Sequence, residues 1–495
     1  MSSTPKTFLA VDLGAGSGRV IAGRYDGATL VLETLNRFDN TPVEIAGHIH
    51  WNVPALLTGI REGIAKALAE GAAPASVGVD TWGVDYGLLD KDGRLLGLPY
   101  AYRDARNDGS ADAFCSRVGG RRPVYARTGI QFMDFNTLFQ LDVESRTGDP
   151  LPPKADRLLF MPDLMNYWLS GVAANEATIA STSNAIDLST RTWAWDLLDA
   201  AGAPRRLFRD PVRPGTVLGP VRGFGGAGFP VVTVGGHDTA SAVASVPANP
   251  STKWGYLATG TWALMGVLID TPLANDESFA LNYTHEGGVA GDFRFLKNIT
   301  GMWLLQELRR DWQRRGRDLP YAEIERLATA SRPFARFVDP DAAPFAAPGD
   351  MSAKFVDFCR RTGQTPPATE GEAARAAYEG LVLRYREVWG ELERLTGVRR
   401  SVLHMVGGAT RDALHCQLVA DALGIPVVCG PVEGTAYGNI LAQLVASGDL
   451  ASFDEGRALV GASVSPTVYE PRDTAPWDDA FARWLAVRDA FRATA

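Results

Sequence analysis

Alternating apolar and polar positions at the start of the chain predict three consecutive strands. The segment TFLAVDLG (7–14) is typical of a strand, GAGSG forms a glycine turn, and RVIAGRYD (19–26) and TLVLETLNRF (29–38) are two further strands. Apolar residues at helical spacing predict a helix over VPALLTGIREGIAKALAE (53–70), after which ASVGVDTWGVDYGLLD (75–90) returns to a strand. This β-β-β-α-β order differs from the plain βαβ alternation of a dinucleotide-binding domain.

The second half of the chain repeats this theme. KWGYLATGTWALMGVLID (253–270) is again a strand, a Gly-Thr turn and a strand, and a long helical pattern follows around 371–397. SVLHMVGGATRDALHCQLVADALG (401–424) predicts a strand, a Gly-Gly turn and a helix. Because each half opens with a glycine hairpin, we expect a duplicated α/β fold with a ligand-binding cleft between the halves.

A chain of 495 residues is too long for one hydrophobic core, so two domains are expected. The stretch VPANPSTK (246–253), rich in proline and small polar residues, predicts their border. We therefore expect one domain over residues 1–247 and a second over 248–495. The amphipathic pattern at the end of the chain predicts a helix that packs on the second domain.

Composition narrows the class of protein. Apolar residues make up 46% of the chain, the formal net charge is −8, and no basic run is long enough to bind a phosphate backbone, which argues against nucleic acid as a partner. The N-terminus lacks the features of a signal peptide, and no apolar run is long enough to span a membrane. The 4 cysteines lack metal-ligand spacing and are expected to be buried thiols, so we expect a cytoplasmic protein.

The stretch VVTVGGHDTASAV (231–243) predicts a strand, a Gly-Gly turn and the start of a helix. It carries Asp238 to the N-terminus of that helix, where the helix dipole favours an anion. Taken alone, Asp238 could be no more than an N-cap, with His237 filling the turn. A catalytic carboxylate is the alternative, and the rest of the chain has to decide between the two.

Three glycine turns could approach phosphate groups closely. DLGAGSGR (12–19) and ATGTWA (258–263) each lie between two strands, and VGGAT (406–410) lies between a strand and a helix. Neither hairpin is a Walker loop or a dinucleotide fingerprint, because both of those need a following helix. Each turn alone could also be an ordinary turn between regular elements.

Together with GGHD, these turns form an ordered set that resembles the actin/hexokinase/Hsp70 superfamily, which is ribonuclease H-like, and within it the FGGY carbohydrate kinases. The resemblance covers the chain from Phe8 to about Ser447. Finer motifs are similar to those of the rhamnulokinase branch, namely VDLGAGSGR, GVDTWGVDYGLLD, LPYAYRDAR, RTGIQFMDFNTLFQL, VGGHDTASAV, ATGTW and LKNITGMWLLQ. The resemblance implies ATP-dependent phosphorylation of the 1-hydroxyl of a ketose, L-rhamnulose, by two domains that close over the substrates.

The same resemblance implies a role for each matching residue. Asp238 would be the general base that takes the proton of the sugar hydroxyl. Sugar contacts are expected from Gly83, Arg103, Asp104, His237, Thr239 and Asn298. Nucleotide contacts are expected from Gly14, Ala15, Gly16, Ser17, Gly18, Arg19, Thr261, Gln306 and Gly408. Asp12 is expected near Mg²⁺, through phosphate or water, so ATP and Mg²⁺ are the implied cofactors.

Several of these residues have an ordinary structural alternative. Gly83 could be a turn glycine, Asn298 a turn residue in a loop, Gln306 a solvated helix residue, and Arg103 with Asp104 a structural ion pair. The sequence also departs from the family pattern, with Ala409 and Asp412 where a third glycine and an asparagine are usual, and Gly434 where alanine is usual. The departures near VGGAT put the details of nucleotide contact in doubt.

Three other functions stay open at this point. The first is another FGGY kinase, acting on L-fuculose, L-ribulose or D-xylulose, because one hydrogen bond can decide sugar specificity. The second is a non-catalytic sugar or nucleotide sensor, and the third is a metal-dependent hydrolase built on His237 and Asp238. The last would need further ligands that no local motif supplies. Monomer and homodimer are equally open.

Overall fold

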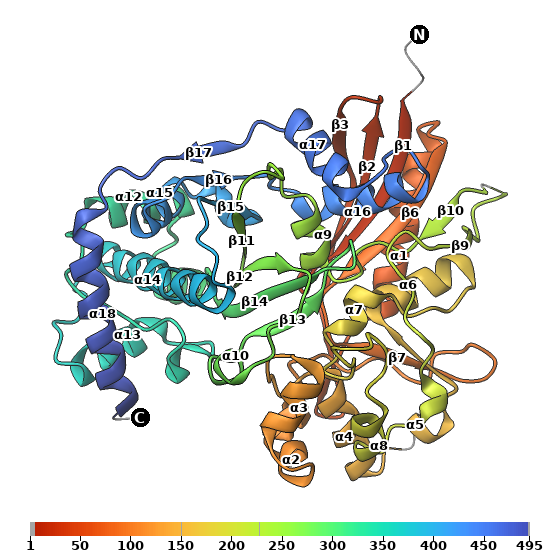
Figure 1. Cartoon of the computed structure of the whole chain (residues 1–495), viewed down its shortest axis with the longest axis horizontal. Coiled ribbons are helices and arrows are strands. Elements are labelled where there is room, and N and C mark those ends of the chain that lie inside the picture. The colour runs from red at the N-terminus through yellow and green to blue at the C-terminus, as the bar shows by residue number, and fades with distance from the viewer. Residues whose placement is uncertain (1–4, 150, 227, 494–495) are drawn as a thin grey trace. The chain divides into compact units, whose positions relative to one another are not determined.

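A computed structural model describes residues 5–149, 151–226 and 228–493. The chain forms two compact units (Figure 1). Unit 1 comprises Met1–Asn249, Leu268–Leu296 and Glu433–Ser465, and unit 2 comprises Pro250–Val267, Lys297–Val432 and Pro466–Ala495. The first change of unit falls two residues beyond the border predicted after residue 247, and two later segments return to unit 1.

Unit 1 contains most of the strands and the shorter helices. Its strands are β1 (Lys6–Leu13), β2 (Ser17–Tyr25), β3 (Leu30–Asp39), β4 (Val43–Ile45), β5 (His48–His50), β6 (Pro74–Thr81), β7 (Tyr86–Leu89), β8 (Arg157–Phe160), β9 (Val217–Pro220), β10 (Pro230–Val232) and β13 (Thr284–Gly287), with the first part of β14 (Phe293–Thr300). Its helices are α1 (Val53–Ala69), η1 (Ala105–Asn107), α2 (Ser110–Arg117), α3 (Arg121–Thr128), α4 (Thr137–Thr147), α5 (Leu151–Lys154), α6 (Met161–Ser170), α7 (Ala177–Ser181), α8 (Trp195–Ala200), η2 (Arg205–Leu207), α9 (Asp238–Ala244), α10 (Asp276–Ala280), α16 (Gly434–Ala446) and α17 (Phe453–Ser463).

The main sheet of unit 1 is six-stranded, in the order β3-β2-β1-β6-β10-β9. β2 pairs antiparallel with β1 and β3, while β6 pairs parallel with β1 and β10. Both faces of β1 are covered: Leu9 and Val11 pack in one apolar cluster with α1 and α6, and Phe8 and Ala10 in another with α16. This explains why the strand is apolar at almost every position.

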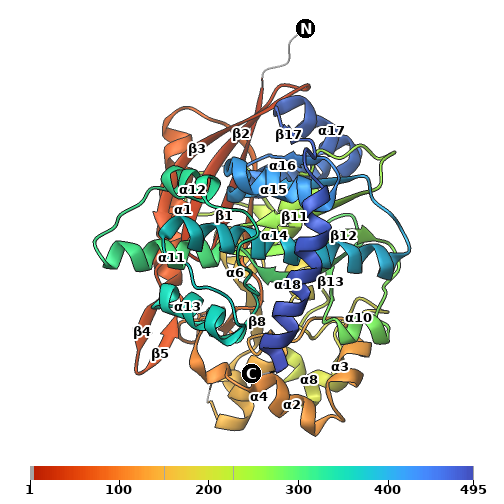
Figure 2. The same cartoon turned by 90° about the vertical axis from the view of Figure 1, so that its left-hand side faces the viewer.

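Unit 2 combines most strands of the second sheet with long helices. Its elements are β11 (Trp254–Thr259), β12 (Trp262–Ile269), the rest of β14, α11 (Trp303–Arg314), α12 (Tyr321–Ala330), η3 (Ala343–Phe345), α13 (Met351–Arg361), α14 (Glu370–Thr396), β15 (Val402–Val406), η4 (Gly408–Arg411), α15 (Ala413–Leu423), β16 (Val427–Cys429), β17 (Thr467–Tyr469) and α18 (Ala475–Ala493). The seven-stranded sheet has the order β13-β14-β12-β11-β15-β16-β17. The predicted C-terminal helix is α18, which packs on α14 (Figure 2).

The two sheets share one topology. In unit 1, β2 and β1 form an antiparallel pair that continues into parallel β6 and β10; β12 and β11 form the same pair and continue into parallel β15 and β16. The predicted duplicated α/β fold is therefore confirmed. The predicted β-β-β-α-β start is also confirmed, as β1, β2, β3, α1 and β6, with the short hairpin β4–β5 inserted before α1.

The single strand predicted over 75–90 was wrong. It is broken at Trp82–Asp85 into β6 of the six-stranded sheet and β7, which pairs with β8. Val84 has φ +69, a left-handed conformation that interrupts a strand, and its N–H donates to the Thr182 hydroxyl at 3.1 Å. The break turns Asp85 into the protein interior.

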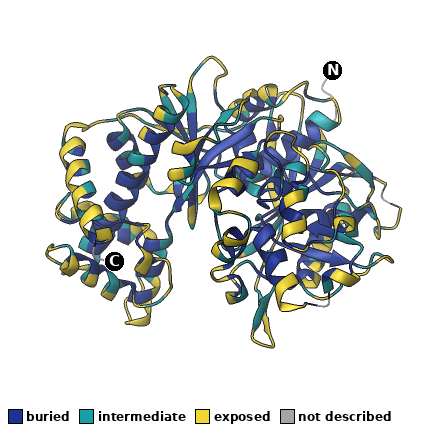
Figure 3. Cartoon of the chain, turned by 60° about the horizontal axis from the view of Figure 1, so that its bottom comes forward, coloured by how far each residue is buried: buried dark blue, intermediate teal, exposed yellow. Residues whose placement is uncertain are grey.

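The core follows the central strands of the sheets, which are mostly dark blue in Figure 3, while exposed side chains lie mostly on the outer faces of helices, in loops and on the outer strands. All 4 cysteines are buried and free, as predicted. Among the described residues, no helix is both long enough and apolar enough to cross a membrane.

Candidate active site

The Gly-Gly-His-Asp turn (235–238, the GGHD turn) joins β10 to α9, as the sequence predicts. The N–H of Thr81, the last residue of β6, donates to the Gly236 carbonyl at 2.9 Å, and Thr81 pairs in parallel with His237. Asp238 is thereby delivered to the carboxyl end of β6, the edge where open α/β sheets bind their ligands. It is the first residue of α9, whose N-cap is His237, so Asp238 is not the N-cap of this helix.

The backbone of this turn is held by the start of α7. The Glu176 carboxylate accepts the Gly236 N–H at 2.9 Å, and the Thr178 hydroxyl accepts the His237 N–H at 3.3 Å. A Cβ on Gly236 would lie 2.7 Å from Glu176 Oε2, so this close approach requires glycine. Burial raises the pKa of Glu176 to about 6, and the hydrogen bonds that it accepts oppose that rise.

The side chain of Asp238 is the accessible group of the turn, with 31% of its surface exposed. Its Oδ1 accepts a hydrogen bond from the Thr239 hydroxyl at 3.0 Å and lies 3.5 Å from His237 Nε2. The structure therefore brings the predicted base together with both of its predicted neighbours. A half-exposed carboxylate with a hydroxyl and an imidazole beside it can accept a proton from a bound hydroxyl group.

Two further carboxylates lie on the neighbouring strands. Asp12 of β1 is directly opposite Asp80 of β6, and both side chains are buried. Burial raises the pKa of Asp12; Arg19, which forms an ion pair with it, lowers that pKa, and the nearby Asp238 raises it. Burial and then Asp12 raise the pKa of Asp80 well above its usual range. Arg19 also forms an ion pair with Glu433, just before α16, so this one cation is shared between Asp12 and Glu433.

The first glycine hairpin is the β1–β2 turn. Its Gly14 N–H donates to the Ser17 carbonyl at 2.9 Å, and the Asn40 side chain donates to the Gly14 carbonyl at 2.9 Å. Within the part of the chain that the structure describes, the amides of Ala15 and Gly16 donate no hydrogen bond, so they can receive phosphate oxygens. Gly18 differs from the others, because a Cβ there would lie 2.4 Å from the Phe38 ring. Its glycine serves packing within the sheet.

This carboxylate set fits Mg²⁺ that arrives with a nucleotide. The described residues contain no group of three or more histidine, cysteine or acidic side chains arranged to hold a metal ion. Mg²⁺ rarely uses such a protein cage, and is commonly bound through one or two carboxylates together with substrate phosphates and water. Asp12 offers such a carboxylate beside the open amides of the hairpin, and Asp80 adds an oxygen, Oδ1, that has no partner among the described residues.

The predicted sugar contact Gly83 lies in the break between β6 and β7, where a Cβ would lie 3.2 Å from the Thr182 side chain. The neighbouring Asp85 fixes this segment. Its carboxylate accepts hydrogen bonds from the indole N–H groups of Trp51 and Trp82, at 2.6 and 3.0 Å, and from the Tyr102 amide and Gln140 side chain, both at 3.1 Å. Burial raises the pKa of Asp85 to about 6 against these donors. Gly83 thus sits beside a rigid polar centre.

The predicted pair Arg103 and Asp104 is divided between two tasks. Asp104 caps η1 through the Arg106 amide at 3.0 Å and accepts the Ile49 amide at 2.6 Å and His48 Nδ1 at 3.0 Å. Its carboxylate therefore anchors β5. Arg103 does not pair with Asp104; its Nε donates to the Tyr102 hydroxyl at 3.0 Å.

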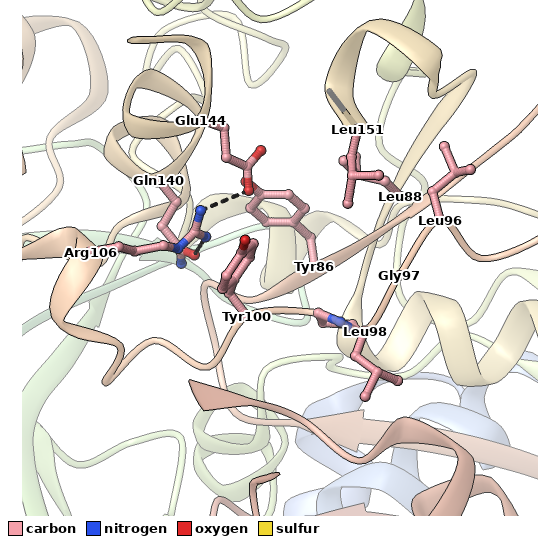
Figure 4. A pocket seen from close by; sticks show the side chains of 11 residues that line it. Tyr86, Leu88, Leu96, Gly97, Leu98, Tyr100, Arg106, Gln140, Glu144 and Leu151 are labelled. Atoms are coloured by element: carbon pink, nitrogen blue, oxygen red, sulfur yellow. Dashed lines mark hydrogen bonds and ion pairs between the residues drawn. The ribbon is translucent and has the colours of Figure 1, made fainter. Parts of the chain in front are cut away.

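A small cavity of about 20 Å³ in unit 1 lies beside Asp85 and its hydrogen-bond donors (Figure 4). It has room for roughly one water molecule. Polar side chains gather at one end of it and leucines at the other. Arg106 donates to Glu144 at 3.0 Å and to Gln140 at 2.9 Å, and its guanidinium lies 3.7 Å from the Tyr100 ring centroid. Because Gln140 also donates to Asp85, the wall of the cavity supports the segment that holds Gly83.

In unit 2, the other two glycine turns lie side by side. Thr261 of the β11–β12 turn contacts Gln306 of α11, with its hydroxyl 3.2 Å from Oε1. β11 pairs with β15, which brings the VGGAT turn next to this hairpin. Gly407 has φ +96, and a Cβ there would lie 2.6 Å from the Thr259 carbonyl oxygen, so only glycine fits. Gly408 begins η4, and a Cβ there would meet nothing within 4 Å.

Two more residues of unit 2 that the sequence singled out, Asn298 and Asp412, lie in a strand and at the start of a helix. Asn298 lies within β14, so it is not a turn residue. Asp412, the departure from the family pattern, caps α15 by accepting the His415 amide at 2.9 Å and also accepts the Tyr378 hydroxyl. Both of its oxygens serve the fold of unit 2.

Two residues next to the GGHD turn were missed in the sequence. Glu286 of β13 and Arg294 of β14 lie opposite each other in the register of that hairpin and contact His237 Nδ1, at 3.2 and 3.0 Å. They come from the segment 268–296 that returns to unit 1. The alternation in THEGGVAGDFRF (284–295) could have predicted a hairpin, but not the contact with His237.

Comparisons with known proteins cover nearly the whole chain. The model of the N-terminal domain of the FGGY family of carbohydrate kinases matches residues 7–244, and the model of the C-terminal domain of that family matches residues 255–447. Rhamnulokinase of Bacteroides thetaiotaomicron is 44% identical over 481 residues, which cover 96% of this chain and 98% of that protein. Rhamnulokinase of Pectobacterium atrosepticum is 43% identical over 453 residues, covering 90% of each. Among solved structures, xylulose kinase of Lactobacillus acidophilus has the same fold, with a TM-score of 0.81, 17% identity and 99% of both chains covered.

Proposed function

We propose, from the premise that this chain belongs to the FGGY family of carbohydrate kinases, that it transfers the γ-phosphoryl group of ATP to the 1-hydroxyl of L-rhamnulose. Rhamnulokinases are among the relatives that it matches over 90% or more of their length. The observation that carries the chemistry is the half-exposed Asp238 at the carboxyl end of β6, with Thr239 and His237 at its oxygen. ATP and a sugar are the substrates of such a kinase.

Asp238 acts in this proposal as the general base. It accepts the proton of the sugar hydroxyl while that oxygen forms its bond to the γ-phosphorus, and the bond from the γ-phosphorus to the bridging oxygen breaks, so that ADP leaves with the electron pair. Phosphoryl transfer asks the protein mainly for positioning and for stabilisation of charge. One accessible carboxylate is therefore enough, and Asp12 and Asp80, which are buried, have a different task.

The Ala15 and Gly16 amides would donate hydrogen bonds to the phosphate end of the nucleotide. Mg²⁺, held by Asp12 through phosphate or water, would neutralise charge on the phosphates. Thr261, Gln306 and Gly408 of unit 2 are proposed as further nucleotide contacts, and Gly83 and Asn298 as sugar contacts. Asp104, whose carboxylate anchors β5, is proposed to act on the sugar only through the segment that it holds. The substrate ATP suggests a cytoplasmic enzyme, acting as a monomer or a homodimer.

A coupled assay of ADP release tests this proposal. We expect L-rhamnulose to give the highest kcat/KM in a panel with L-fuculose, L-ribulose, D-xylulose and glycerol, and little ADP release without sugar. Asp238→Asn keeps the shape of the side chain but removes the base, so kcat should fall about 10²- to 10⁴-fold. Its thermal unfolding curve should match that of the wild type.

Asp276→Asn is the matched control, because Asp276 also begins a short helix of unit 1 and its side chain is 78% exposed. This variant should keep wild-type kcat. If another ketose is preferred, the enzyme is a carbohydrate kinase of different specificity. If Asp238→Asn stays active, the base lies elsewhere.

A further inference from the structure

The two ring nitrogens of His237 face different neighbours. Nε2 lies on the side of Asp238, 3.5 Å from its Oδ1, whereas Nδ1 lies 3.0 Å from Arg294 and 3.2 Å from Glu286. A neutral imidazole carries a proton on only one of its nitrogens. What contacts Nδ1 therefore decides whether Nε2 donates or accepts next to Asp238.

Glu286 and Arg294 form a buried pair with a fixed position. They lie opposite each other on β13 and β14, with Arg294 2.9 Å from Glu286 Oε2, and their side chains are 8% and 0% exposed. Arg294 Nε also donates to the Gly287 carbonyl at 3.0 Å. Burial is the largest influence and raises the pKa of Glu286, but the Arg294 charge and the contacts with His237 and Arg294 together outweigh it, and the pKa is lowered to about 2. Both groups are thus charged at neutral pH.

The direction of the Arg294 hydrogen bond selects one tautomer. A guanidinium group has only N–H donors, and one of them is directed at His237 Nδ1. Among the described residues, Glu286 Oε2 receives no aligned hydrogen bond, so its contact with Nδ1 is one of proximity. Nδ1 therefore accepts, and the ring proton is on Nε2. The opposite tautomer would turn the Nε2 lone pair toward the Asp238 carboxylate, which is unfavourable.

We propose that Arg294, held in place by Glu286, is a positioning residue that fixes His237 as a hydrogen-bond donor through Nε2. The proposal rests on the kinase function above and names the sugar group that is recognised: an oxygen acceptor of the ketose beside the reacting hydroxyl. With its Nε2 protonated, His237 cannot take the proton of that hydroxyl. The two neighbouring side chains therefore have separate roles, donor for His237 and base for Asp238.

Nitrogen NMR of the full-length protein with ¹⁵N-labelled histidine reads this tautomer directly. The chain has 6 histidines, and the resonances of His237 are identified by their loss in His237→Gln. In the wild type we expect the signals of a neutral ring with a proton on Nε2 and none on Nδ1. A wild-type ring with its proton on Nδ1, or on both nitrogens at pH 7.5, overturns the proposal, and the tautomer is read from the wild type itself, with His237→Gln used only to assign the signals.

Removing the donor should change the tautomer. In Arg294→Met, Glu286 loses its partner and becomes the acceptor for an Nδ1 proton, so Nε2 becomes an acceptor. We expect the NMR signals to exchange or the ring to become doubly protonated, with a rise of about tenfold or more in KM for the ketose. KM for ATP should stay within about twofold, because the group that His237 contacts is an oxygen of the sugar and not a phosphate of the nucleotide. Arg294→Lys, which keeps a charged donor, should recover part of the wild-type KM.

Arg375→Met is the matched control. Arg375 and Glu379 of α14 also form a buried pair, at 2.5 Å and with side chains 11% and 1% exposed. This variant should lose stability like Arg294→Met but leave the His237 signals and both KM values unchanged. An Arg294→Met protein with wild-type His237 signals, or with equal changes in both KM values, contradicts the proposal. A wild type that turns over no ketose contradicts the kinase function, while the NMR result still decides the tautomer.

Discussion

At the scale of single residues, Asp85 couples folding to pH. The folded protein holds the proton of this carboxyl up to a pKa of about 6, against 3.8 for an unperturbed aspartate, because burial disfavours its charge. Between these values the folded state binds more protons than the unfolded state, so the free energy of unfolding falls as pH rises. The shift corresponds to about 3 kcal/mol, present below pH 4 and lost above pH 6.

Urea unfolding from pH 4 to 7.5 measures this loss when wild type is compared with Asp85→Asn. The asparagine side chain does not titrate, so the unfolding free energy of the variant should fall less between pH 4 and 6 than that of wild type, by about 3 kcal/mol, the contribution of Asp85. Other acids, such as Glu176, titrate in both proteins and cancel in the difference. A difference between the two proteins that is constant with pH would show that Asp85 does not titrate in this range.

The residues that could be read from the sequence are those whose surroundings are local. Asp12, Asp238 and the glycine turns were found because each lies at the end of an apolar strand, within a few residues of the feature that gives it meaning. Glu286 and Arg294 reach the GGHD turn from a hairpin about fifty residues further along the chain, so no local pattern points to their contact with His237. Asp85 was hidden for another reason, since it looked like one alternating position of a strand.

At the scale of elements, the packing of α16 on α9 depends on Gly438. A Cβ at this position would lie 1.7 Å from the Ser241 carbonyl oxygen and 2.5 Å from its carbon, so the two helices would have to separate. We expect Gly438→Ala to lower the free energy of unfolding by about 3 kcal/mol. The Ser241 hydroxyl donates to the Gly235 carbonyl at 2.8 Å, so α9 would move together with the GGHD turn. kcat should therefore fall about 10- to 100-fold.

Gly390→Ala is the control for this prediction. Gly390 also lies inside a helix, α14, but a Cβ there meets nothing within 4 Å. The substitution should stabilise the protein by up to about 1 kcal/mol through helix propensity alone and leave kcat unchanged. Thermal and urea unfolding with the ADP-release assay compare the two variants. Equal effects of both substitutions would mean that α9 and α16 can accommodate a methyl group.

Elements were predictable wherever one periodicity continued. The strands β1, β2 and β3 were predicted from their apolar strand patterns and the helices α1 and α14 from helical spacing, and their bounds differ from the predictions by a few residues. The prediction failed at Trp82–Asp85, where the alternating sequence pattern continues but the extended backbone conformation is interrupted. Val84 takes a left-handed conformation there because the Thr182 hydroxyl and the donors around Asp85 hold the segment, and those contacts come from elsewhere in the fold.

At the scale of the whole molecule, the sequence predicted only part of how the chain is divided between the two units. The repeated glycine hairpins revealed the duplication, and the proline-rich stretch near residue 250 marks the first change of unit. The return of residues 268–296 and 433–465 to unit 1 could not be predicted, because an apolar helix face such as that of α16 does not reveal which sheet it covers. Only the packing of Ile440 and Leu441 against Phe8 and Ile21 shows it.

This return predicts that the first 249 residues cannot fold alone into unit 1. One face of its sheet, with Phe8, Ala10, Ile21 and Leu30, is buried by side chains of α16 and α17. Burial of Ile440, Leu441 and Leu444 is worth roughly 5–9 kcal/mol, which is comparable to the whole stability of a domain, about 5–15 kcal/mol. We expect a fragment of residues 1–249 to unfold without cooperativity and to bind a hydrophobic dye, and a fusion that adds residues 268–296 and 433–465 to unfold in one transition. The same fusion with Ile440→Glu should behave like the short fragment. Cooperative unfolding of residues 1–249 alone would mean that the sheet is stable with this face uncovered.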